Sequence, residues 1–152
     1  MRRRLFWIFV ALQALVPVAM AGLREADVAF APHVLLRVEP VDPRDFFRGQ
    51  YVELRYDVGA VSPQAPDGAT VYVPLHREGD VWTGDYATTA RPDATAVRGR
   101  VRDGRIELGI ERYYVSESKA RRYERALLEH RVYADVALGR DWRPALRRLV
   151  IK

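Results

Sequence analysis

The sequence predicts a mainly β (α+β) fold: a small antiparallel β-sandwich or barrel-like domain with one C-terminal amphipathic helix, preceded by one N-terminal transmembrane helix. Three observations predict it. Apolar and polar residues alternate through most of the chain after residue 33, as half-buried strands require. The interval 116–130 has helical spacing instead. The first 23 residues contain a long uncharged apolar stretch.

The length of 152 residues suits one globular domain and is too short for two once the apolar N-terminal segment is set aside. We therefore divide the chain into a membrane anchor or signal peptide at 1–23, a linker at 24–33 and a single extracytoplasmic mainly β domain at 34–152. The sequence contains no cysteine, which excludes disulfides, thiolate nucleophiles and zinc–thiolate sites.

The formal net charge is +5, but Arg2, Arg3 and Arg4 precede the apolar segment without an acidic neighbour. The rest of the chain carries +2, with both signs interspersed. A nucleic-acid-binding protein usually gathers its basic excess into a patch or stripe, so we expect no nucleic-acid partner.

The segment 5–21 carries no charge, and Gln13 and Pro17 interrupt its apolar character. A helix of this length just crosses the roughly 30 Å hydrocarbon core of a bilayer, which implies contact with membrane lipid. The arginines before it and the mixed charges after it place the N-terminus in the cytoplasm by the positive-inside rule. The sequence thus predicts a single-pass protein with its domain on the outer side.

A cleavable secretory signal is the alternative for the same segment. A basic start, a short apolar region, Pro17 and then Ala19-Met20-Ala21 resemble a signal peptide and its cleavage site. Trp7 and the apolar stretch as far as Leu23 favour a retained anchor. Both alternatives export the domain.

Alternating segments predict the first strands. A strand is expected at 34–39, where Pro40 closes it, and the clearest one covers 51–58. In the latter, one face carries Val52, Leu54, Tyr56 and Val58, and the other carries Tyr51, Glu53, Arg55 and Asp57. The segment 62–68, with two prolines, is expected to be a loop.

Two hairpins are expected next. The segments 71–76 and 81–86 flank a short Gly-containing turn at 77–80. The second hairpin turns at Asp103-Gly104, a pair that suits type I′ geometry because both central residues need positive φ. That turn sets a register, which pairs Val101 with Ile106, Gly99 with Leu108 and Val97 with Ile110, and places Arg100 beside Glu107 as an exposed ion pair.

The predicted helix at 116–130 begins at a serine cap and has Glu117 in its first turn, where the helix dipole favours an acid. Ala120, Tyr123 and Leu127 form an apolar stripe that we expect to lie on the sheet. Two further strands, 132–138 and 145–151, are joined by a turn containing Gly139 and Pro144.

The segment 42–56 reads DPRDFFRGQYVELRY and resembles the bacterial GDYXXLXY family. Gly49, Tyr51, Leu54 and Tyr56 match the string that names this family, whereas Gln50 replaces its aspartate. The segment 111–115 and the apolar N-terminal segment are also similar to family members. The resemblance implies a bacterial inner-membrane protein, with its C-terminal domain periplasmic or extracytoplasmic, and a possible multi-span membrane protein as partner.

The motif allows a structural and a binding interpretation. As structure, Asp42 caps a helical turn, Asp45 completes a capping box, Gly49 ends the turn, and Leu54 and Tyr56 enter the core. As a binding surface, the exposed side of the motif is formed by Asp42, Asp45, Arg48, Tyr51, Glu53 and Arg55.

We recognise no convergent nucleophile and base, and we predict no catalytic residue, no metal site and no cofactor. The string 116–119 matches the Ser-x-x-Lys of penicillin-binding enzymes, but the other motifs and the length of that fold are missing. His33, His76 and His130 lack the short spacing of metal ligands. We therefore expect a membrane-anchored extracytoplasmic interaction or accessory domain, and the alternative is an exported hydrolase of unrecognised type.

Overall fold

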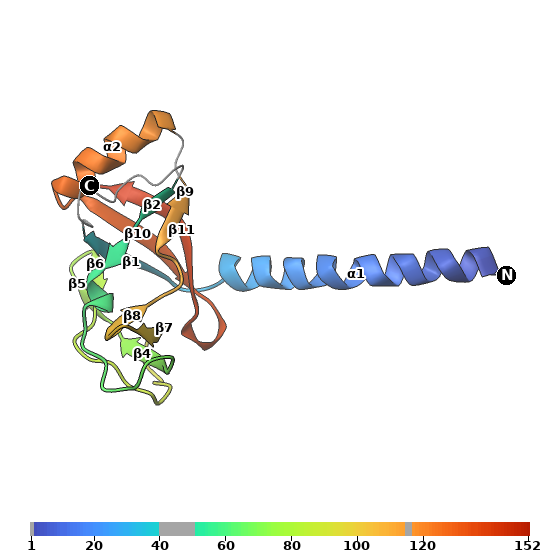
Figure 1. Ribbon diagram of the computed structural model, residues 1–152, viewed down its shortest axis with the longest axis horizontal. Helices are drawn as coiled ribbons and strands as arrows, with labels where there is room; N and C mark the ends of the chain where they lie inside the picture. The colour runs from blue at the N-terminus through green and yellow to red at the C-terminus, as the bar shows by residue number, and fades with distance from the viewer. Residues whose placement is uncertain (1, 40–50, 115–116) are drawn as a thin grey trace.

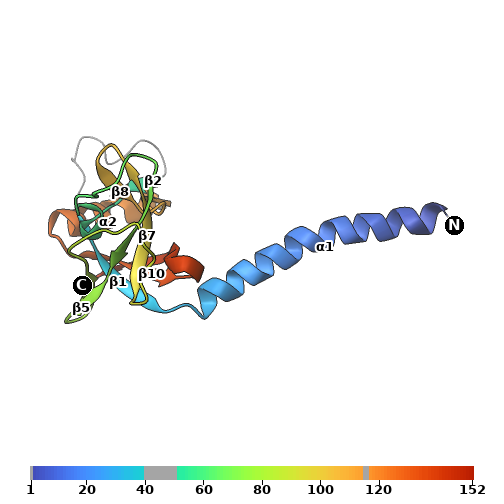
Figure 2. The same cartoon turned by 90° about the horizontal axis from the view of Figure 1, so that it is seen from below.

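The computed structural model describes residues 2–39, 51–114 and 117–152. Helix α1 (Arg2–Ala29) projects away from the rest of the molecule, as both views show (Figure 1, Figure 2). It includes the first part of the predicted linker at 24–33, because no proline or glycine follows Gly22 before Ala29 to end the helix earlier. Among the described residues, no helix satisfies the length and hydropathy that a membrane crossing requires.

The remainder is mainly β, as predicted, and its described strands form three sheets. The first has the order β11-β10-β1-β6-β5 with β3 beside β1, the second pairs β2 with β9, and the third has the order β4-β7-β8. The strands are β1 (His33–Glu39), β2 (Tyr51–Glu53), β3 (Arg55–Tyr56), β4 (Thr70–Pro74), β5 (His76–Glu78), β6 (Val81–Thr83), β7 (Ala96–Arg102), β8 (Arg105–Glu107), β9 (Arg112–Tyr114), β10 (Val132–Leu138) and β11 (Pro144–Ile151).

Strand β1 lies at the centre of the first sheet and pairs antiparallel with β10, with Leu36 opposite Ala134. Its pairing with β6 is parallel, with Leu36 opposite Trp82. The predicted antiparallel arrangement is wrong for this pair, whereas the other described strand pairs are antiparallel. A parallel pair needs a long crossover, and the chain between β1 and β6 is long enough to supply one.

One core joins the first and third sheets and the second helix. Buried side chains come from β1 (Leu36, Val38), β4 (Val71, Val73), β7 (Val97, Val101), α2 (Leu127) and β10 (Leu138). Helix α2 (Glu117–Leu128) contributes Ala126 as well, and Tyr123 packs partly against the same cluster. Burial of these apolar side chains is the main favourable term that holds the sheets together.

The predicted strand at 51–58 is interrupted. After β2 the backbone N–H of Leu54 donates to the carbonyl oxygen of Glu111 at 2.6 Å, β3 follows, and the chain then turns through a 3₁₀ segment at Asp57–Gly59. The predicted faces hold where side chains are described, because Leu54, Tyr56 and Val58 are buried while Glu53 and Arg55 are exposed. Alternation thus gave the correct faces, although the segment does not continue as one strand.

The first predicted hairpin is wrong in its partners. Strand β4 pairs with β7, and the hairpin consists of β5 and β6, which turn at Gly79-Asp80 with Glu78 opposite Val81. All three central residues of β4 are buried, as expected of a strand that packs into the core on both faces, whereas β5 is fully exposed.

The second hairpin has the predicted turn, with positive φ at Asp103 (49°) and Gly104 (72°) and with Val101 opposite Ile106. The predicted pairs farther from the turn are not formed, because β8 ends at Glu107. On its other edge β7 pairs with β4, with Gly99 opposite Val71 and Val97 opposite Val73. Arg100 is opposite Glu107, as predicted, but the ion pair of Glu107 is formed with Arg102, at 3.4 Å.

Candidate functional site

The motif corner, formed by Glu53–Tyr56 together with residues 108–111, is where the family-like motif meets the rest of the domain. The Tyr56 hydroxyl donates to the carbonyl oxygen of Ile110 at 2.9 Å. One carboxylate oxygen of Glu111 accepts the backbone N–H groups of Leu108 at 2.5 Å and Gly109 at 3.2 Å. Burial raises the pKa of Tyr56, and the Glu111 carboxylate adds to the effect, so the hydroxyl remains a donor. Leu54 and Tyr56 therefore hold the corner together.

Two of the predicted binding residues come together on the exposed side of this corner. Glu53 and Arg55 line a cleft of about 190 Å³ together with Glu39, Arg102, Arg105 and Glu107. Its mixed charges suit a polar protein surface. Tyr51 pairs through its backbone with Tyr114, and its side chain is not described. Asp42, Asp45, Arg48 and Gly49 lie outside the described residues.

Asp57 follows the motif directly and is partly buried. Its carboxylate accepts the N–H of Val58 at 2.7 Å. Burial raises its pKa above the ordinary 3.8; Glu39 and Glu78 act in the same direction, and the Val58 hydrogen bond and Arg37 oppose them. The folded protein therefore favours the protonated acid relative to the unfolded chain.

Replacement of this acid gives a pH-dependent prediction. A raised acid pKa means that the folded state binds more protons than the unfolded state, so this group lowers stability as pH rises from 3.8 through its folded pKa. Asp57→Asn removes the ionised form and keeps an oxygen for the Val58 N–H. We expect a higher free energy of unfolding at pH 7 than in the wild type, with the difference disappearing below pH 3.8. Urea denaturation across this pH range measures it, and an equal difference at all pH values would contradict it.

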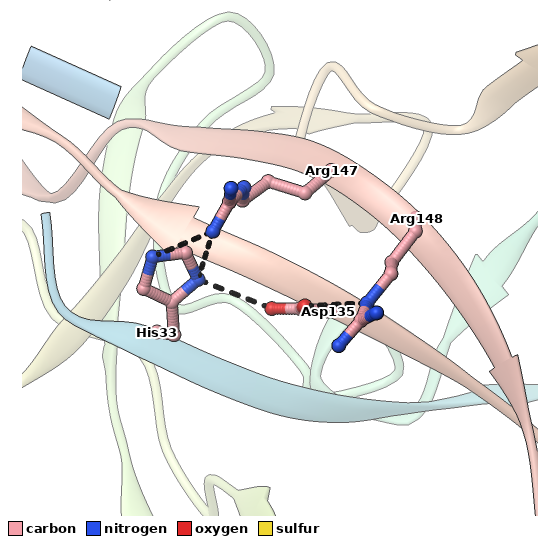
Figure 3. Close-up of polar contacts among 4 residues, drawn as sticks. All are labelled: His33, Asp135, Arg147 and Arg148. Carbon is pink, nitrogen blue, oxygen red and sulfur yellow. Dashed lines mark hydrogen bonds and ion pairs between the residues drawn. The ribbon is translucent and has the colours of Figure 1, made fainter. Parts of the chain in front are cut away.

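A second polar group, the bulge cluster, consists of His33, Asp135, Arg147 and Arg148 on β1, β10 and β11 (Figure 3). His33 Nδ1 lies 3.2 Å from Asp135 Oδ1, Arg148 Nε donates to Asp135 Oδ2 at 3.0 Å, and an Arg147 guanidinium nitrogen lies 3.1 Å from His33 Nε2. Because a guanidinium can only donate, these contacts fit a proton on Nδ1 of His33 and none on Nε2.

The bulge cluster arises from a break in strand register. Asp135 is opposite Arg148 while Val136 is opposite Leu146, so Arg147 is the extra residue of a β-bulge. Two consecutive side chains of β11, both exposed, can then approach the same histidine–aspartate pair. Alternation cannot predict that two consecutive side chains of one strand approach the same partners. The adjacent arginines at 147 and 148 were the one indication of this bulge in the sequence.

A third feature, the junction cleft, lies between the end of α1 and the turn from β10 to β11. It has a volume of about 490 Å³, and its lining includes Ala26, Asp27, Phe30, Arg91, Leu138, Arg140, Asp141 and Trp142. Asp141 and Trp142 both have φ of 57°, in the left-handed region that L side chains rarely adopt. Sequence analysis predicted a turn here but not a cleft.

Contacts of Asp141 and Trp142 hold this strained turn. The Asp141 carboxylate accepts the Tyr72 hydroxyl at 3.0 Å, pairs with Arg98, and lies 3.5 Å from Arg91 Nε. The Trp142 indole N–H donates to the carbonyl oxygen of Pro92 at 3.2 Å. Burial and the hydrogen bond to Asp141 raise the pKa of Tyr72, so its hydroxyl stays protonated. Strain supported in this way is commonly found at functional positions.

Comparison with protein families gives a match to one model, described as GDYXXLXY protein, over residues 13–149. The match covers nearly the whole chain and includes the motif corner, the bulge cluster and all lining residues of the junction cleft. Comparison with curated proteins and with solved structures gives no match.

Proposed function

The chain belongs to the GDYXXLXY family, as the motif indicated, and we propose that it is a membrane-anchored extracytoplasmic interaction domain whose partner is a multi-span membrane protein. In this proposal α1 stays in the bacterial inner membrane, the N-terminus is cytoplasmic, and the β domain lies on the periplasmic side. The strands form a small, mainly antiparallel sandwich or barrel-like domain. Helix α2 is amphipathic and packs its apolar face on this domain, which the burial of Ala126 and Leu127 supports.

The exposed apolar surface of α1 is the observation that carries the proposal. The exposed side chains are Trp7, Phe9, Val10, Leu12, Leu15, Val16, Val18, Met20 and Leu23, and the helix projects from the domain instead of packing on it (Figure 1). A helix that is apolar all round is unfavourable in water and is stable within lipid. The arginines at its start favour a cytoplasmic N-terminus.

The motif corner supports the choice of an interaction function. Its buried half, Leu54 and Tyr56, fixes the backbone, while its exposed half presents Glu53 and Arg55 on rigid elements. Charged groups arranged on a fixed backbone give specificity to protein–protein contacts. We therefore propose that this exposed half faces the membrane partner.

One cross-linking experiment tests the anchor and the partner together. The full-length chain is produced with a photo-reactive amino acid in place of Arg55, or in place of the exposed Asp93 as a control. We expect the chain to remain with membranes after carbonate extraction, and we expect position 55, but not 93, to cross-link to a multi-span membrane protein. Equal cross-linking from both positions, or none, would contradict the proposed partner surface.

A pair of matched helix variants makes the anchor test specific. Leu12→Arg puts a charge near the middle of the apolar segment, where an arginine costs about 3 kcal/mol in insertion, whereas Leu23→Arg puts it near the end, where the side chain can reach water. We expect the first variant to be extracted by carbonate and to lose its cross-link, and the second to behave as the wild type. The mass of the mature chain distinguishes the anchor from a signal peptide, because cleavage would remove residues 1–21.

A further inference from the structure

We infer that the junction cleft binds the phosphate group of an anionic phospholipid in the outer leaflet of the membrane that α1 crosses. The inference rests on the proposed function, because it takes α1 to be in the bilayer. It adds a ligand site, with Arg91 and Arg140 as the phosphate-binding residues and with Phe30 and Trp142 as its apolar lining.

The distance along α1 sets the depth of the cleft. At 1.5 Å per residue, Asp27 lies roughly 6 Å beyond Leu23, the last residue of the apolar segment. The polar headgroup region of a bilayer extends roughly 5 to 8 Å beyond the hydrocarbon core on each side. The cleft is lined by Ala26 and Asp27 of this end of the helix and by Phe30, which follows α1, and it is therefore at the level of the lipid phosphates.

Two arginines of the cleft are free to turn toward a phosphate. The side chain of Arg140 is 89% exposed and lies 3.4 Å from Asp27, and that of Arg91 is 63% exposed and lies 3.5 Å from Asp141. Such exposed ion pairs are weak in water. Asp141 keeps Arg98 and the Tyr72 hydroxyl when Arg91 moves, so its charge does not become unpaired.

The charge and chemistry of the lining favour an anionic lipid. The lining carries two arginines, Arg91 and Arg140, and two acids, Asp27 and Asp141. Arg98, which is not part of the lining, pairs with Asp141 from outside the cleft, so the charge of Asp141 is compensated without Arg91 and that arginine is left for an anionic ligand. Phe30 is 91% exposed in water and adds an apolar surface to the cleft at the level of the lipid headgroups. A guanidinium binds phosphate oxygens with two parallel hydrogen bonds.

The test uses the full-length protein in nanodiscs made of equal parts of phosphatidylglycerol and phosphatidylcholine. Native mass spectrometry counts the lipids that stay with the protein after release. A basic residue near an anionic membrane surface contributes about a fivefold preference, so we expect phosphatidylglycerol to be enriched by about tenfold or more in the wild type. The Arg91→Gln/Arg140→Gln variant is expected to retain the two lipids nearly equally, and Arg140→Gln alone to be intermediate.

Arg131→Gln is the matched control, because Arg131 is also an exposed, ion-paired arginine and its guanidinium donates to the carbonyl oxygen of Lys152. The C-terminus lies near α2 and away from α1 (Figure 1). We expect it to keep the wild-type enrichment. An equal loss in this control would show that net charge selects the lipid and would overturn the site. Unchanged enrichment in the double variant, or displacement of the lipid by added inorganic phosphate, would overturn it as well. If the wild type shows no enrichment but resists carbonate extraction, the lipid site fails while the proposed function stands.

Discussion

Leu54→Ala is expected to lower the free energy of unfolding by about 3 to 4 kcal/mol. Leu54 is fully buried, and it lies at the break between β2 and β3, where its N–H is bonded to Glu111. Removal of a large buried side chain loses its transfer free energy and leaves a cavity that the fixed backbone cannot close. This loss is a large fraction of the total free energy of unfolding of a typical domain, which is about 5–15 kcal/mol.

The measurement is urea denaturation of the full-length protein in detergent, followed by tryptophan fluorescence. Arg55→Ala is the matched control, since Arg55 is the exposed neighbour in the same motif and its loss is expected to change stability by less than about 0.5 kcal/mol. If Leu54→Ala cost under about 1 kcal/mol, the motif leucine would not be the core residue that its burial indicates.

Strands specified by local pattern were predictable. Strand β1 follows its alternation throughout, strand β10 follows it as far as Val136, and the Asp103-Gly104 turn has the positive φ values that its residue types favour. The faces of Leu54, Tyr56 and Val58 were predicted for the same reason. Each of these features depends on side-chain periodicity or on the conformational preference of a residue pair, and both can be read within a few positions of sequence.

Pairings between distant strands were not predictable from such patterns. Strand β4 reads equally well as half of a hairpin with the next segment, and its pairing with β7 depends on which core it completes. The bulge at Arg147 interrupts the alternation of β11, and Asp141 has a positive φ that glycine usually supplies. Contacts with residues far away in the chain stabilise both features.

The candidate site was predictable in part. Glu53 and Arg55 were expected to be exposed and are, and they share a cleft. The partners in that cleft, Arg102, Arg105 and Glu107, come from the β7–β8 hairpin about fifty residues later. The junction cleft depends on how α1 ends against the β10–β11 turn, and no local motif marks that contact.

Gly99→Ala is the second substitution expected to have a large effect, with a loss of about 2 kcal/mol. A Cβ at this position would lie 2.3 Å from Ile106 Cγ2 and 2.9 Å from the carbonyl oxygen of Glu107. Both neighbours belong to β8, which is paired to β7, so relief requires the strands to separate or Ile106 to leave its rotamer. Alanine also lowers the conformational entropy of the unfolded chain relative to glycine, but this stabilisation offsets less than about 1 kcal/mol of the cost.

Two further variants separate overpacking from a general intolerance of substitution. Gly139 has a negative φ, and a Cβ added there would lie no closer than 3.6 Å to any neighbouring atom. We therefore expect Gly139→Ala to be nearly neutral in the same urea titration. Ile106→Leu removes the Cγ2 branch, and the Gly99→Ala/Ile106→Leu double variant is expected to be more stable than the sum of the two single effects predicts. Strict additivity would mean that the clash with Ile106 is not the cause. The close approach of β7 and β8 at Gly99 would then have to be set by the Glu107 carbonyl, and the loss in Gly99→Ala would persist whatever side chain occupied position 106.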